Sequence, residues 1–119
     1  MKFCWTTLVV KDLEESLTFY KEVVGLKEKR RMKGPGVDIV FLGDGETEIE
    51  LMTSPKPREI NMGADISLGF EVASVDDKIK ELKEKGIAIH SGPFQPAPSV
   101  KFFYLLDPNG LKIQFVENL

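Results

Sequence analysis

An internal repeat is the feature that most constrains what this chain can fold into. Residues 42–51 align with residues 106–115 at an offset of about 64 positions, which matches Glu50 with Gln114. The apolar residues that precede these segments repeat at an offset of about 62 positions, and the matched sets are Leu13, Leu17 and Tyr20, and Val75, Ile79 and Leu82. The repeat predicts two copies of one folding unit.

The length suits this organisation. A chain of 119 residues can form one compact domain from two half-size modules that share a core, whereas each half alone would be only marginally stable. We therefore expect a single domain, with a first module at residues 1–53, a linker at 54–64 and a second module at 65–119.

Composition narrows the classes of partner. The net charge is −3 and 29% of the residues are charged, without the clustered excess of Lys and Arg that binds phosphate backbones. Nucleic acid is therefore not an expected partner. Cys4 is the only cysteine, which excludes a disulfide within the chain. The sequence has neither a signal-peptide core nor an apolar run of membrane length, so we expect a cytoplasmic protein without a membrane partner.

The first module is predicted to contain a strand, a helix and three more strands. Alternating residues at 3–10 indicate a strand, and the apolar stripe that follows indicates a helix capped by Asp12 and ended by Gly25. Strands are expected at 26–33, 37–43 and 47–53. The basic residues at 27–33 are interpreted as protection of an edge strand, since charges there discourage pairing with other chains.

The second module repeats this order. We expect a strand at 65–72, a helix capped by Ser74 and ended by Gly86, a short strand at 87–90, and strands at 100–106 and 111–117. The proline-rich segment 92–99 is predicted to be a loop. Asp107-Pro108-Asn109-Gly110 has the residue order of a type I turn, and it joins the last two strands as a hairpin.

Alternation along the strands separates an apolar face, which the helices should cover, from a polar face. Cys4, Leu8 and Val10 are placed on the helix side. The opposite face contains Trp5, Thr7, Val9, Glu48, Glu50, Met52, Ser67, Gly69, Glu71, Lys112 and Gln114. We expect an α+β fold in which the two modules form a curved mixed-sheet cup, with these residues as the wall of a ligand site.

A resemblance to a known family rests on three stretches of this chain. These are Val-Lys-Asp-Leu-Glu-Glu-Ser-Leu-Thr-Phe-Tyr at 10–20, Gly25-Leu26, and the turn at 107–110. With the tandem modules, they resemble the vicinal oxygen chelate superfamily over essentially the whole chain. That superfamily contains glyoxalase I, bleomycin-resistance proteins and extradiol dioxygenases. The resemblance implies the glyoxalase-like fold, but it does not select one activity.

The family's enzymes hold a divalent metal with residues from the first and fourth strands of each module. Those positions fall here on Trp5, Glu50, Ser67 and Gln114, of which only Glu50 is an ordinary metal ligand. A catalytic zinc takes about three protein ligands, and the only histidine, His90, is not at a motif position. We therefore expect no metal cofactor at these positions.

Two of these residues have alternative interpretations. Glu50 is either a general base or residual metal ligand, or a carboxylate that is solvated or paired with Lys112. Trp5 either stacks on a planar or cationic ligand or fills the cup. A regrouping of Asp65, Ser67, Glu48 and Glu50 into an oxygen-only cation site is disfavoured, because Asp65 lies near a strand end.

The leading hypothesis is a metal-free protein of the bleomycin-resistance kind that binds a small organic molecule. Its predicted ligand-binding residues are Trp5, Thr7, Glu48, Glu50, Ser67 and Gln114. An acidic wall of Glu48, Glu50 and Glu71 would favour a neutral or cationic ligand. The alternative is a glyoxalase-like lyase or isomerase in which Glu50 is the catalytic residue and moves a proton next to a carbonyl. The resemblance also implies a homodimer, since relatives often complete their cups across a two-fold interface.

Overall fold

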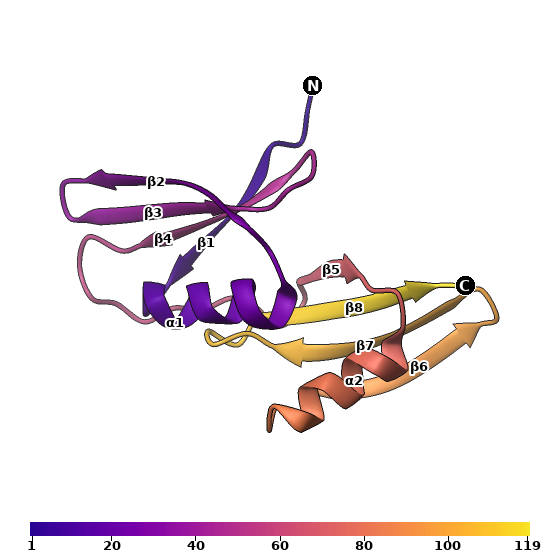
Figure 1. Ribbon diagram of the computed structural model, residues 1–119. Coiled ribbons are helices and arrows are strands. Elements are labelled where there is room, and N and C mark those ends of the chain that lie inside the picture. Colours follow the sequence, from indigo (N-terminus) through magenta and orange to yellow (C-terminus); the bar gives the residue numbers. More distant parts are fainter. The chain divides into compact units, whose positions relative to one another are not determined.

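The computed structural model describes residues 1–119, which divide into two compact units, Met1–Asn61 and Met62–Leu119. Each unit contains a four-stranded mixed sheet and one helical segment, as Figure 1 shows for each unit by itself. The α+β class and the two tandem modules predicted from the repeat are confirmed.

The first unit contains β1 (Trp5–Val10), α1 (Leu13–Thr18), β2 (Glu28–Gly34), β3 (Val37–Leu42) and β4 (Glu48–Thr53). The helix α1 continues directly as a π-helical segment, η1 (Phe19–Val24). The strand order is β1-β4-β3-β2, with β1 parallel to β4 and the other pairs antiparallel.

The second unit contains β5 (Ser67–Glu71), α2 (Val75–Glu84), β6 (Ser91–Ala97), β7 (Val100–Leu106) and β8 (Lys112–Asn118). Its strand order, β5-β8-β7-β6, and its single parallel pair, β5 with β8, reproduce those of the first unit. The internal repeat in the sequence is therefore a repeat of topology.

Both helices begin and end where the sequence predicts. The Asp12 carboxylate accepts a hydrogen bond from the Glu15 backbone N–H at 3.0 Å, and Gly25 ends η1 with a left-handed φ of 89°. The Ser74 hydroxyl oxygen accepts from the Asp77 backbone N–H at 3.1 Å in the same way. These caps satisfy backbone groups that have no partner inside the helix.

Each helix covers one face of its own sheet. In the first unit Leu17, Tyr20 and Val23 are buried together with strand residues such as Leu8 and Leu51. Val23 is buried more deeply than Val24, because π-helical winding changes which side chains face the sheet. In the second unit the buried helix residues are Val75 and Leu82, and the buried strand residues are Phe103, Leu105, Ile113 and Phe115.

The prediction for residues 87–99 is wrong in both parts. Residues 87–90 form no strand, and most of the segment expected to be a loop is the strand β6. Pro93 and Pro96 are compatible with a strand there because β6 is an edge strand whose pairing with β7 shifts register twice, so a proline removes no essential ladder hydrogen bond.

The expectation for Cys4 is also wrong. Cys4 is exposed and precedes β1, which starts at Trp5, so the alternation of the strand does not extend to it. No helix in this structure has both the length and the apolar character needed to cross a membrane.

Candidate ligand-binding site

The sheet of the first unit carries a row of four side chains on the face opposite its helix. The register joins Thr7 of β1 to Glu50 of β4, Glu50 to Phe41 of β3, and Phe41 to Arg30 of β2. We call Trp5, Thr7, Arg30, Phe41, Glu48 and Glu50 the first-sheet face. It crosses all four strands, so its geometry is set by the rigid ladder and not by loops.

Glu50 is the most enclosed acid of this face, with 9% of its surface exposed. The Thr7 hydroxyl donates a hydrogen bond of 2.5 Å to Glu50 Oε1. No Lys or Arg of the first unit forms an ion pair with Glu50. A carboxylate held by one hydroxyl keeps acceptor capacity for a further donor, which is the property that a binding or proton-accepting group needs.

Arg30 neutralises the neighbouring acid. Its Nη1 lies 3.0 and 3.2 Å from the two carboxylate oxygens of Glu48, and its guanidinium carbon lies 3.8 Å from the ring centroid of Phe41. Trp5 meets the same Phe41 ring edge-on at a centroid distance of 5.1 Å. Arg30 is therefore part of the first-sheet face, which adds a specific role to its interpretation as edge protection.

The predicted acidic wall is consequently reduced to one residue. Glu48 is paired with Arg30, and Glu71 is exposed and accepts a hydrogen bond from the Asn118 amide. Only Glu50 remains without a charged or amide partner in its own unit. The three carboxylates differ in their partners and therefore in their free acceptor capacity. Alternation in the sequence places residues on a face but does not reveal these cross-strand partners.

The second unit has a corresponding face with different chemistry. The register joins Gly69 of β5 to Gln114 of β8 and Gln114 to Tyr104 of β7. The Gln114 amide donates a long hydrogen bond of 3.4 Å to the Tyr104 hydroxyl. A Cβ at Gly69 would lie 3.2 Å from Gln114 Oε1, so the missing side chain gives this amide its space.

Three aromatic rings lie on this side of the second sheet. Phe94 and Phe102 have a centroid separation of 5.6 Å, and Phe102 and Tyr104 one of 5.7 Å. Lys112 Nζ lies 5.9 Å from the Tyr104 ring centroid. We call Ser67, Gly69, Phe94, Phe102, Tyr104, Lys112 and Gln114 the second-sheet face. It offers stacking surfaces and neutral or cationic donors.

The structure groups the predicted residues within each unit. Trp5 is the register partner of Glu48 and Thr7 that of Glu50, so four predicted residues adjoin one another on the first sheet. On the second sheet, Ser67 is exposed and pairs with Lys112 instead of Gln114. The roles of these residues in binding stay predictions.

Sequence reasoning missed several members of the two faces. Phe41 was assigned to no face, and Arg30 was interpreted only as part of the basic run at 27–33. Val40, Phe41 and Leu42 are all buried, so apolar character alone does not show that Phe41 lies on the face opposite the helix. Phe94 was assigned to a loop. Of the consecutive residues 102–104, only Phe103 lies on the helix side, where it stacks on Phe115.

The four family metal positions do not fit a transition metal. The Trp5 indole nitrogen only donates hydrogen bonds, and Ser67 and Gln114 supply a neutral hydroxyl and a neutral amide. Glu50 is therefore the single strong ligand among the four positions. The structure brings together no group of three or more His, Cys, Asp or Glu side chains that could hold a metal ion.

Comparison with known proteins decides the family. The model of the Glyoxalase/Bleomycin resistance protein/Dioxygenase superfamily matches residues 2–115. The chain belongs to this superfamily. A lactoylglutathione lyase of Haemophilus influenzae is 30% identical over 132 residues, covering 99% of this chain and 93% of the relative. The uncharacterised YwbC protein of Bacillus subtilis is 32% identical over 121 residues, with 94% of each chain covered.

Solved structures share the fold of this chain. The trypanothione-dependent glyoxalase I of Leishmania major superposes with a TM-score of 0.81 at 22% identity, covering 98% of this chain and 86% of that one. TnmS3, an antibiotic-binding protein from Streptomyces, superposes with a TM-score of 0.79 at 21% identity, covering 100% and 97%. At these identities the likeness establishes the fold and leaves enzyme and binding protein both open.

Proposed function

We propose that this member of the glyoxalase and bleomycin-resistance superfamily binds a small organic molecule on its two polar sheet faces without the family metal. The donor set at the four metal positions carries the proposal. Only Glu50 of the four can ligate a metal strongly, whereas aromatic rings are present on both faces. Trp5, Thr7, Glu48, Glu50, Ser67 and Gln114 are the proposed ligand-binding residues.

The proposed ligand has a planar or apolar body and at least one hydrogen-bond donor. A donor, neutral or cationic, would complete the free acceptor capacity of Glu50. Trp5 would stack against the body of the ligand. We further propose that the protein is cytoplasmic and that it forms a homodimer. The molar mass in solution is the direct measurement of the oligomeric state.

A second candidate is a glyoxalase-like lyase or isomerase with Glu50 as the base. The relatives named lactoylglutathione lyase support this candidate, as does the retention of an enclosed carboxylate oriented by Thr7. It requires proton abstraction next to a carbonyl, for which the Glu50 carboxylate is chemically suited.

Elemental analysis and a ligand screen test the first candidate against the second. We expect the purified protein to contain no stoichiometric zinc, nickel or iron, and we expect ligands to quench the fluorescence of Trp5, the only tryptophan. Lactoylglutathione formation that is abolished by Glu50→Gln would favour the enzyme. About one transition metal per chain, removed by a chelator together with activity, would overturn the metal-free proposal.

A further inference from the structure

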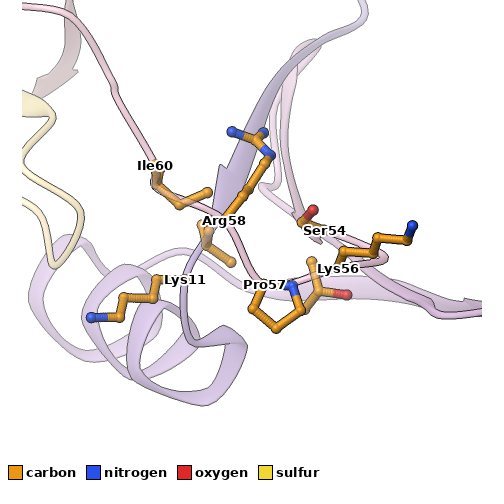
Figure 2. A pocket seen from close by; sticks show the side chains of 8 residues that line it. Lys11, Ser54, Lys56, Pro57, Arg58 and Ile60 are labelled. Atoms are coloured by element: carbon orange, nitrogen blue, oxygen red, sulfur yellow. The ribbon is translucent and has the colours of Figure 1, made fainter.

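The first unit has a cavity that lies apart from the first-sheet face. It is formed where β1 and β4 end and where residues 54–60 pass over these ends, and its volume is about 350 Å³. Figure 2 shows the lining side chains, all of which come from the first unit. This volume is at the lower end of the range for small-molecule sites, which is about 300–1,000 Å³.

Part of the lining is apolar and part can donate hydrogen bonds. Val10, Pro57 and Ile60 supply apolar surface. The Thr53 hydroxyl oxygen accepts from the Asp38 backbone N–H at 2.9 Å, which leaves its O–H to donate, and the Ser54 hydroxyl is a second donor. The cavity can therefore hold an apolar body and an acceptor group together.

The charged lining is of one sign. Lys11, Lys56 and Arg58 line the cavity, and no Asp or Glu does. In Figure 2 the charged ends of these three side chains point in different directions. Arg58 Nη1 donates to the Glu59 carbonyl at 3.1 Å, which uses one of the five guanidinium donors. Positive charges around a partly apolar cavity attract an anion into it.

The internal repeat provides a comparison within the same chain. The hollow after β5 in the second unit has a volume of about 220 Å³ and is lined by Val72 and Ala73, the counterparts of Val10 and Lys11. Its charged lining is mixed, because Lys78 is accompanied by Asp77 and Glu81, and Lys78 is paired with Glu81 at 3.2 Å. Only Val72 and Ala73 of this hollow correspond to lining positions of the first cavity. Lys56 and Arg58 lie in the segment 54–60, outside the repeated helices and strands, so the positive lining of the first cavity comes mainly from this linker.

We propose that the cavity lined by Lys11, Lys56 and Arg58 binds a small organic anion that combines an apolar body with a carboxylate. The apolar surface would take the body, and the hydroxyls and cations would take the carboxylate. A charge-assisted hydrogen bond to Arg or Lys is about twice as strong as a neutral one. This site is independent of the function proposed for the sheet faces.

Titration of isotope-labelled protein with hexanoate tests the proposal, with amide chemical shifts as the readout. We expect saturable shifts at Lys11, Ser54 and Arg58, and binding of hexanol that is weaker by about tenfold or more. Arg58→Ala and Lys11→Ala should each weaken hexanoate binding by about tenfold, while Lys29→Ala, which removes the same charge from β2, should leave it unchanged.

Three results would overturn the proposal. The first is an absence of saturable shifts at the cavity, or shifts confined to the sheet faces. The second is equal weakening by Lys29→Ala, which would indicate nonspecific charge attraction. The third is inorganic phosphate binding as tightly as hexanoate, because the apolar surface would then contribute nothing. Melting temperatures of the variants verify that each remains folded.

Discussion

At the scale of residues, Glu50 and Gln114 show how the two copies of the repeat have diverged. They are equivalent positions, but Glu50 faces Thr7, whose hydroxyl binds it, whereas Gln114 faces Gly69 and turns to Tyr104. One unit therefore presents an enclosed carboxylate and the other a neutral amide beside aromatic rings. The two equivalent positions therefore differ in charge and in the kind of neighbour that they bind.

Trp5 is the residue whose change tests the proposed stacking most directly. It is 42% exposed in the structure, so part of its ring is available to a ligand. Trp5→Ala should weaken binding of a ligand found in the screen by about 1–2 kcal/mol, because the stacking face is lost. Trp5→Phe keeps an aromatic ring and is the matched control, which should retain most of the affinity. Calorimetry measures the affinity of each variant. Unchanged affinity in the alanine variant would place the site away from this residue.

At the scale of elements, an ionic network joins η1 to the edge strand β2. Glu28 accepts from Lys21 of η1 at 2.5 Å and from Arg31 of β2 at 2.6 Å. Two hydrogen bonds lower the pKa of Glu28 from 4.5 to about 2, and the bond from Arg31 has a larger effect than the bond from Lys21. The network fixes the start of a strand that has a partner on one side only.

The lowered pKa of Glu28 predicts a pH-dependent contribution to stability. A carboxyl whose pKa is lower in the folded state than in the unfolded state stabilises the folded state. For Glu28 this stabilisation is fully present above pH 4.5 and is lost as the pH falls towards 2. Glu28→Gln should therefore reduce the free energy of unfolding at pH 7 by about 0.5–1 kcal/mol, the range for exposed pairs, and should have a much smaller effect near pH 2.

Denaturant unfolding at several pH values checks this prediction, with Glu46→Gln as the control. Glu46 is exposed in the turn between β3 and β4, so its replacement should change stability little at any pH. A loss for Glu28→Gln that is the same at pH 7 and pH 2 would assign the effect to packing instead of charge.

At the scale of the whole molecule, the repeat predicts that the two units together build one site. The first- and fourth-strand positions of each unit, Trp5 with Glu50 and Ser67 with Gln114, would then lie at the floor of a single cup. This expectation can be tested by restoring metal ligands. Trp5→His, Ser67→His and Gln114→Glu, with Glu50 kept, would supply two imidazoles and two carboxylates, a set suited to zinc or nickel.

The triple variant should melt at a lower temperature than the wild type without metal and recover when zinc or nickel is added. Replacing a buried tryptophan lowers the free energy of unfolding by about 3–5 kcal/mol. The loss at Trp5 should be smaller, because its ring is partly exposed. Metal at 100 times its dissociation constant should return about 2.7 kcal/mol by binding the folded form. The same variant with Glu50→Gln is the control and should gain less. A folded triple variant that is indifferent to metal would mean that the four positions do not meet.

The sequence by itself determined the architecture of each unit. The repeat, the alternation of apolar residues, the caps at Asp12 and Ser74 and the glycines that end the helices are local signals. The structure confirms the elements that they predict, except for the strand expected at 87–90, which forms at Ser91–Ala97 instead. Alternation also placed Trp5, Thr7, Glu48 and Glu50 on one face of the first sheet, because the side-chain period of a strand is fixed at two.

Only the tertiary structure decided how these side chains are partnered. Arg30 reaches Glu48 and Phe41 across strand boundaries, Thr7 binds Glu50 over 43 positions of sequence, and Phe94 joins Phe102 because a proline-rich segment pairs as an edge strand. Cross-strand register depends on which distant strand lies alongside and where bulges shift the pairing, and neither is encoded in a local pattern. For this reason the faces of the site were predictable from the sequence, but the charge that each face presents was not.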